Sequence, residues 1–242
     1  MKVCIRSCAS TYDPVQLITG LMAAVLVFFA VSHVRAHELN NKRIASLKRA
    51  VVIVTTYDNH GCPLLQGSGF FIAPDRIVTN LHVISHANEI HIETFARKIF
   101  SVQTIIDTDV GSDLALLQVK GLRTNDVLQV ESATPVEGES IILLSNPQGS
   151  HWKVSHGRVG RLWLFDSIGS RLQITADIFP GSSGGPVLNQ QGQVVGIAVM
   201  RMDSADDLNF AVPAGNLRTL QASASVAGNR DKAIASQPSQ LQ

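Results

Sequence analysis

Short apolar runs rich in β-branched residues alternate with turn-forming residues from Ala50 onward. Each run is bounded by Gly, Pro, Asn or Asp, which is typical of β-strands joined by turns. A break from Ser132 to Gly138 separates two series of runs. The first series reads AVVIVTTY, GSGFFIA, RIVTNL, EIHIETF, FSVQTII and LALLQV, and the second reads SIILLS, HGRVGRLWLF, RLQITA, GPVLN and QVVGIAVM. Two sets of about six strands predict an all-β protein built from two barrels or sandwiches.

The start of the chain follows a different pattern. An unbroken apolar run from Leu17 to Val31 comes after the basic residues Lys2 and Arg6. It is apolar on every side, whereas a helix of the folded domain would have a polar face. The run is typical of an export signal cut after Ala36, and it is shorter than the roughly 20 residues of a membrane anchor. We expect residues 1–36 to be a signal peptide, or an uncut signal anchor that holds the protein at a membrane.

The end of the chain is polar and rich in small residues over 223–242, which predicts a disordered tail. A short helix is expected just before it, after Pro213. The folded domain is therefore expected within residues 37–222.

Charge and cysteine content narrow the classes of function. Lys plus Arg number 20 and Asp plus Glu 19, so the formal net charge of +1 creates no field that would attract nucleic acid. Cys4 and Cys8 precede the apolar run, which leaves only Cys62 beyond it and allows no internal disulfide there. A secreted animal protein of this size would carry several disulfides. We expect an exported bacterial protein, in the periplasm or on the outer face of the inner membrane.

The strongest chemical signal is the segment PGSSGGPVLN, from Pro180 to Asn189. A serine among glycines indicates a tightly folded backbone that presents the Ser183 hydroxyl and directs amide N–H groups at one point. The segment also satisfies the GxSxG pattern of α/β-hydrolases, but that fold needs a histidine after the serine. No histidine follows His156, so an esterase of that fold is excluded.

Two upstream residues complete a catalytic triad. His82 follows the apolar run RIVTNL, and Asp113 begins the run DLALLQV. The order His, Asp, Ser is that of chymotrypsin-like proteases. We expect His82 to act as general base, Asp113 to orient its imidazole, and the backbone N–H groups of Gly181 and Ser183 to bind the oxyanion. A metal pair of His82 and His86 lacks the HExxH glutamate and a third ligand, so neither a metal nor a cofactor is expected.

At these residues the chain resembles the HtrA (Deg) family of trypsin-like serine proteases. The family blocks occur in order between about Val51 and Leu220: GSGFFIAPDRIVTNLHVI, SDLALLQV, SNPQG, PGSSGGPVLNQQGQVVGIAV and LNFAVPAGNL. The resemblance implies two six-stranded antiparallel β-barrels, at about 48–131 and 132–213, with the active site in the cleft between them. Most members carry one or two PDZ domains, and we expect none here; Ser182 stands where the family usually has Asn.

The sequence thus predicts a serine endopeptidase that cleaves exported, unfolded or damaged proteins through an acyl-enzyme on Ser183. The substrate class and a homotrimeric assembly are implied by the resemblance alone, and the segment HELNNKRIASLKR offers no obvious aromatic contact for a trimer. One alternative is a protease-like module that binds peptides or acts as a chaperone with little turnover. Another is an enzyme whose oxyanion loop rests in a collapsed state.

The specificity pocket has two interpretations. Ile197, Ala198 and Val199 would shape a small apolar S1 pocket that favours Val, Ala, Leu or Ile. Asp177 stands six residues before Ser183, where trypsin-like enzymes place the carboxylate that selects Lys or Arg. A buried carboxylate would need a cationic partner, and no nearby residue is arranged to receive a long basic side chain, so we favour the apolar preference.

Overall fold

The computed structural model describes residues 41–131, 133–147, 152–202, 208–218 and 220. The chain divides into two units, residues 1–44 and 45–242. The four described residues of the first unit are helical, and all the strands belong to the second. The expected signal segment at 1–36 and tail at 223–242 lie outside the described residues.

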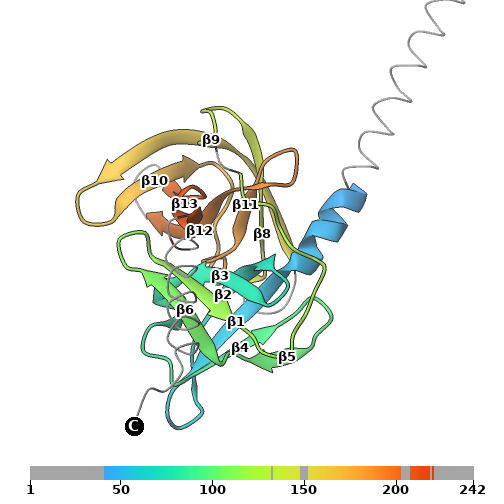
Figure 1. Cartoon of the computed structure of the whole chain (residues 1–242). Helices are drawn as coiled ribbons and strands as arrows, with labels where there is room; N and C mark the ends of the chain where they lie inside the picture. The colour runs from blue at the N-terminus through green and yellow to red at the C-terminus, as the bar shows by residue number, and fades with distance from the viewer. Residues whose placement is uncertain (1–40, 132, 148–151, 203–207, 219, 221–242) are drawn as a thin grey trace, which may run out of the picture. The chain divides into compact units, whose positions relative to one another are not determined.

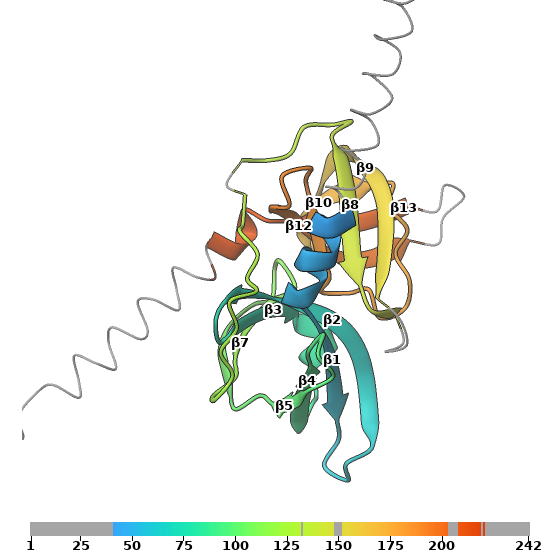
Figure 2. The ribbon, with the colours of Figure 1, turned by 90° about the vertical axis from the view of Figure 1, so that its right-hand side faces the viewer.

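The N-terminal half of the second unit is an antiparallel sheet in the order β5-β4-β1-β2-β3-β7-β6 (Figures 1 and 2). A 3₁₀ turn, η1 (Lys48–Ala50), leads into it, and the four-residue helix α2 (Leu81–Ile84) follows its third strand. The strands are β1 (Val51–Tyr57), β2 (Pro63–Ala73), β3 (Arg76–Asn80), β4 (Glu89–Glu93), β5 (Ile99–Ser101), β6 (Thr104–Asp109) and β7 (Leu114–Gln118).

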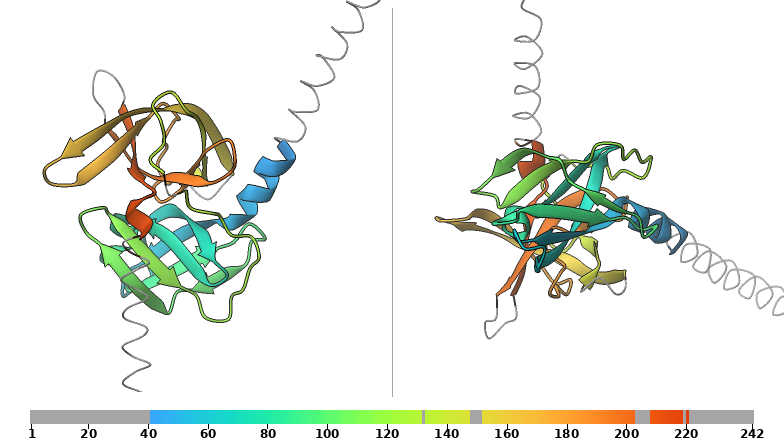
Figure 3. Two further views of the ribbon diagram at one scale, coloured as in Figure 1. Left: turned by 45° about the horizontal axis from the view of Figure 1, so that its top comes forward. Right: turned by 90° about the horizontal axis from the view of Figure 1, so that it is seen from below.

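The C-terminal half is a closed antiparallel barrel in the order β10-β13-β12-β11-β8-β9. Its long β9–β10 hairpin reaches beyond the other strands (Figure 3). The strands are β8 (Ser140–Ser145), β9 (Lys153–Phe165), β10 (Gly169–Ile174), β11 (Pro186–Leu188), β12 (Val194–Met202) and β13 (Leu208–Pro213). The expected closing helix appears as helical residues 216–218.

Each half has its own apolar core, which explains why the sequence showed two series of strands. In the sheet, Val52, Phe71 and Leu117 are among the buried residues of one cluster. In the barrel, Leu143, Leu172 and Val187 are among those of a second. The two-barrel, chymotrypsin-like fold class predicted from the sequence is confirmed, as a closed barrel and a curled sheet.

The sheet has seven strands, where the family pattern implied six. The apolar run FSVQTII was expected to form one strand, but it divides between β5 and β6, which pair with opposite edges of the sheet. Gln103 lies at the division, where its side-chain amide donates to the Ser101 carbonyl and its amide oxygen accepts from Lys120 N–H at 2.8 Å. These bonds satisfy backbone groups that a continuous strand would have paired in the sheet.

Within the described part of the chain, no helix combines the length and the apolar character needed to cross a bilayer.

Candidate active site

His82 is presented by α2, directly beyond the end of β3. Asn80 is fully buried, and its side-chain amide donates to the Asp113 carbonyl at 2.9 Å. The Leu81 N–H donates to the same carbonyl at 3.1 Å. The main chain of Asp113 therefore anchors the start of the short helix that carries the histidine.

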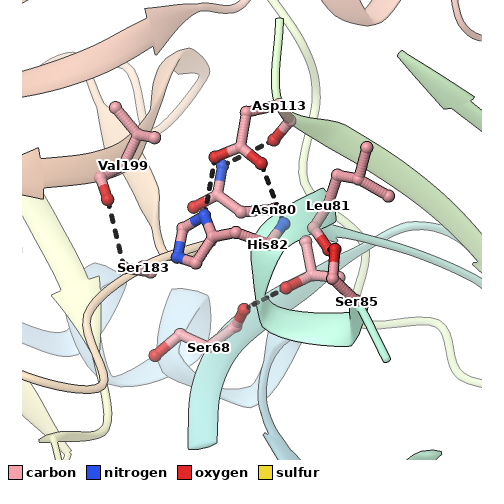
Figure 4. Close-up of polar contacts among 9 residues, drawn as sticks. Ser68, Asn80, Leu81, His82, Ser85, Asp113, Ser183 and Val199 are labelled. Carbon is pink, nitrogen blue, oxygen red and sulfur yellow. Dashed lines mark hydrogen bonds and ion pairs between the residues drawn. The ribbon is translucent and has the colours of Figure 1, made fainter. Parts of the chain in front are cut away.

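Asp113 occupies the turn between β6 and β7 with a φ of 59°. Asp is one of the few non-glycine residues that adopt this left-handed conformation readily. Its Oδ1 accepts the His82 backbone N–H at 2.8 Å, and its Oδ2 lies 2.6 Å from His82 Nδ1 (Figure 4). A carboxylate can only accept, so Nδ1 carries the proton and Nε2 of the neutral ring is left as the basic nitrogen.

A buried cation interacts electrostatically with this carboxylate. Arg171 of β10 is 1% exposed and donates to the Ser170 carbonyl at 3.0 Å. Burial lowers the pKa of the Arg171 guanidinium, whereas the negative charges of Asp113 and Asp109 raise it. Sequence reasoning missed this residue, because its electrostatic interaction links strand β10 to a turn of the N-terminal sheet that is far away in the sequence.

Ser183 lies on the C-terminal side of the site, and Figure 4 shows the second ring nitrogen of His82 turned toward it. Its hydroxyl donates to the Val199 carbonyl at 3.1 Å. No hydrogen bond joins Ser183 to His82 among the described residues, although the structure brings both together with Asp113. Such bonds are often absent in a free enzyme and form only when substrate binds.

The segment before Ser183 forms a tight turn. The Ser182 N–H donates to the Phe179 carbonyl at 2.8 Å, Pro180 is the second residue, and Gly181, the third, has a φ of 90°. Proline second and a positive φ third define a type II turn, which explains the Pro-Gly pair. The Ser182 hydroxyl is buried, contacts Ser145 Oγ at 3.1 Å and accepts from the Phe179 N–H at 3.1 Å.

Two amides of this loop have no hydrogen-bond partner among the described residues, namely those of Gly181 and Ser183. The neighbouring N–H groups of Ser182, Gly184 and Gly185 all donate to carbonyls. The backbone N–H of the nucleophilic serine and that of the residue two positions before it are thus both free to donate. Two such donors beside the nucleophile can bind a tetrahedral oxyanion.

Ser68 of β2 also belongs to the site, and sequence reasoning missed it. Its hydroxyl donates to the Gly181 carbonyl at 2.8 Å, and its N–H donates to the Ser183 carbonyl at 2.7 Å. The glycines on either side of it in GSGFF were the available signal, since glycine within a strand often marks a close approach of another backbone.

The residues expected to form the S1 pocket do not all face the same way. Ala198 packs into the barrel core, so its side chain does not line a pocket beside Ser183. Its main chain instead pairs with the nucleophile loop, accepting from Gly184 N–H at 2.8 Å. Ile197 and Val199 are buried, with exposed fractions of 0% and 5%, and alternate with Ala198 along β12. Asp177 is exposed rather than buried.

With this geometry in place, the comparisons with known proteins decide the family. The model of the trypsin-like peptidase domain matches residues 67–197, more than half of the chain. The chain belongs to the trypsin-like peptidase family. The matched segment includes His82, Asp113 and Ser183, and the resemblance to HtrA (Deg) proteases seen in the sequence is supported by the relatives.

Among curated relatives of this trypsin-like peptidase, serine endoprotease DegS of Haemophilus influenzae is 29% identical over 222 residues, covering 80% of this chain and 65% of its own. Serine protease Rv3671c of Mycobacterium tuberculosis is 28% identical over 211 residues (83% and 50%). Anti-sigma-I factor RsgI9 of Acetivibrio thermocellus is 30% identical over 180 residues (73% and 25%). The chain thus spans between 25% and 65% of the length of these relatives.

Solved structures agree. The active form of the M. tuberculosis Rv3671c protease superposes with a TM-score of 0.66 at 25% identity, covering 74% of this chain and 82% of its own. The serine endoprotease of Yersinia pestis superposes with a TM-score of 0.65 at 25% identity, covering 78% and 67%.

Proposed function

We propose that this trypsin-like peptidase is a serine endopeptidase that uses Ser183, His82 and Asp113 as its triad. The observation that carries the proposal is the pairing of His82 Nδ1 with Asp113 Oδ2 at 2.6 Å, next to a serine flanked by two unbonded amides. The names of relatives such as DegS support peptide hydrolysis as the chemistry.

The reaction follows from the groups present. His82 Nε2 takes the proton of Ser183 Oγ as that oxygen attacks the substrate carbonyl carbon, after the hydroxyl has left the Val199 carbonyl. The N–H groups of Gly181 and Ser183 stabilise the resulting oxyanion. The tetrahedral intermediate collapses, the C–N bond breaks, and His82 gives its proton to the leaving amine. Water then attacks the acyl-enzyme by the same route, which releases the acid and restores Ser183.

We further propose that the natural substrates are exported proteins that are unfolded or damaged, and that the enzyme works in the periplasm or at the outer face of the inner membrane. The apolar segment from Leu17 to Val31 supports export. The DegP-like relatives of Pseudomonas putida, which are 34% identical over 154 residues, are named periplasmic endoproteases.

The S1 pocket is proposed to prefer small or medium apolar side chains. Ile197 is fully buried, so Val199 is the β12 residue that would line it, and the exposed Asp177 does not place a carboxylate at the floor of a buried pocket. Profiling a peptide library with the wild type and with Asp177→Asn separates the alternatives. A strong preference for Lys or Arg in the wild type that disappears in Asp177→Asn would contradict the apolar pocket.

Cleavage of unfolded casein by the purified protein tests the function itself. The wild type should degrade casein, whereas Ser183→Ala should fold normally and lose turnover by several orders of magnitude, because only the nucleophilic oxygen is removed. Undiminished cleavage by Ser183→Ala would overturn the triad. Binding of casein by a wild-type protein that leaves it intact would favour the peptide-binding alternative.

A further inference from the structure

Every polar group of Ser68 is hydrogen-bonded, and its hydroxyl and N–H bond to the C-terminal half of the molecule. The residue is 0% exposed. Its hydroxyl donates to the Gly181 carbonyl at 2.8 Å and accepts from the Asn146 N–H at 3.2 Å. Its N–H donates to the Ser183 carbonyl at 2.7 Å, and its own carbonyl accepts from the Thr79 hydroxyl at 2.8 Å. Figure 4 shows Ser68 on the strand that passes beneath the site.

The nucleophile loop, residues 179–185, is also the oxyanion loop, because it carries the two unbonded N–H groups. Its peptide groups differ in how they are held. The carbonyls of Gly181 and Ser183 are bonded to Ser68, and that of Ser182 accepts from the Gly185 N–H at 2.9 Å. The bond to the Ser182 carbonyl fixes the orientation of the peptide that contains the Ser183 N–H, and the two bonds from Ser68 hold the peptides on either side of it. The Pro180–Gly181 peptide, which contains the other unbonded N–H, lies at the centre of the turn.

This central peptide has an alternative orientation. The same four residues could form a type I turn, in which the third residue has a φ near −90° and the central peptide is rotated by roughly 150° or more. That rotation would point the Pro180 carbonyl where the Gly181 N–H now points, and an oxyanion would lose one of its two donors. The hydroxyl of Ser68 bonds to the carbonyl of the next peptide, Gly181–Ser182, and so anchors the C-terminal end of the segment that would have to rotate.

Two glycines allow Ser68 to come so close. A Cβ at Gly184 would overlap the Ser68 carbonyl oxygen, and a Cβ at Gly67 would lie 3.0 Å from the Ser183 carbonyl oxygen. Gly184 also has a φ of 85°. The backbones of β2 and of the nucleophile loop are thus packed directly against each other, with Ser68 as the bonding residue.

We propose that Ser68 is a positioning residue that holds the oxyanion loop in the type II turn, with both the Gly181 and the Ser183 N–H groups available to the reacting carbonyl. The predicted effect on kcat rests on the proposed peptidase function, whereas the predicted effect on the conformation of the turn does not. Ser68 acts through the backbone of the loop and touches no reacting atom.

The test compares Ser68→Ala with Thr56→Val. Thr56 is also 0% exposed, and its hydroxyl likewise donates to one carbonyl and accepts from one N–H, both of Leu65. Each variant therefore loses a buried hydroxyl with two hydrogen bonds, but the Thr56 hydroxyl bonds only to Leu65 of the β1–β2 hairpin. Ser68→Ala should lower kcat on a peptide substrate about tenfold to a hundredfold with KM changed by less than about threefold, because removing a whole oxyanion donor costs about 10²- to 10³-fold. Thr56→Val should leave both constants unchanged.

Crystal structures of the two variants provide a readout that needs no turnover. In Ser68→Ala the Pro180–Gly181 peptide should be reversed or present in two orientations, whereas Thr56→Val should keep the turn. A Ser68→Ala protein with kcat within twofold of the wild type, or with the type II turn intact, would overturn the proposal. Inactivity of the wild type would count against the peptidase function, and the loop structure alone would then decide the role of Ser68. If Ser68→Ala does not fold, Ser68→Cys, whose thiol is a weaker donor, serves in the same two measurements.

Discussion

The two halves of the molecule hold their parts of the site by different means. In the N-terminal sheet, His82 and Asp113 are fixed largely by side-chain hydrogen bonds of Asn80 and Asp113, and the 2.6 Å contact between His82 and Asp113 is direct. In the C-terminal barrel, the nucleophile loop is shaped by its main chain, with positive φ angles at Gly181 and Gly184. The first arrangement depends on which side chains are present, whereas the second depends on a backbone conformation that the opposite half helps to maintain through Ser68.

Replacing a catalytic side chain in the N-terminal sheet should lower kcat more than a change in the backbone conformation of the barrel loop. Asp113→Asn should lower kcat about 10⁴-fold, because the amide favours the wrong imidazole tautomer. Asn also tolerates the left-handed φ of 59°, so the melting temperature should change little. The matched control is Asp109→Asn, because Asp109 lies in the same turn region and its Oδ1 accepts the Ser112 N–H at 3.0 Å. If Asp113→Asn loses less than about tenfold while the control behaves like wild type, another residue must orient His82.

Changing the backbone conformation of the nucleophile loop in the barrel should lower kcat by a smaller factor. Gly181→Ala places a side chain at a φ of 90°, at a cost of roughly 1–2 kcal/mol in the present turn, so the loop should shift toward the type I form and kcat should fall about a hundredfold. Gly121→Ala carries the same kind of strain, at a φ of 80°, with no atom near the added Cβ. Steady-state kinetics and thermal melting of both variants check this prediction. If Gly181→Ala and Gly121→Ala lose the same stability and keep the same kcat, the turn at Gly181 does not control the chemistry.

The smallest effect is expected where the barrel influences the triad from a distance. Arg171→Met should lower kcat by less than about tenfold, because both hydrogen bonds that His82 donates to Asp113 remain. Stability should be unchanged or higher, because the Nε of this buried arginine has no hydrogen-bond partner within the described part of the chain and Met removes the buried charge. Arg158→Met, at an exposed position of the same hairpin, is the control. A loss as large as that of Asp113→Asn would mean that Arg171 does more than balance charge.

The sequence predicted the parts of this site that lie in continuous motifs. The positions of His82, Asp113 and Ser183 and the existence of two strand series came from local patterns, because strands and turns have short-range signals. The division of FSVQTII into β5 and β6 was missed, since an apolar run does not show that its two ends pair with opposite edges of a sheet. Ser68 was missed for a related reason, as its hydroxyl bonds to a residue 113 positions away. Ala198 points into the core because side chains alternate along β12. The run of three apolar residues in the sequence does not show which of them face the core and which face the pocket.

Reaction with a fluorophosphonate probe, followed by intact mass and peptide mapping, tests the central claim most directly. A fluorophosphonate needs both an activated serine and an oxyanion site, so it reports the two halves of the molecule together. The account predicts a single adduct on Ser183 in the wild type, no adduct in Ser183→Ala, and greatly slowed labelling in Asp113→Asn. A wild-type protein that remains unlabelled, or an adduct that persists in Ser183→Ala, would contradict it.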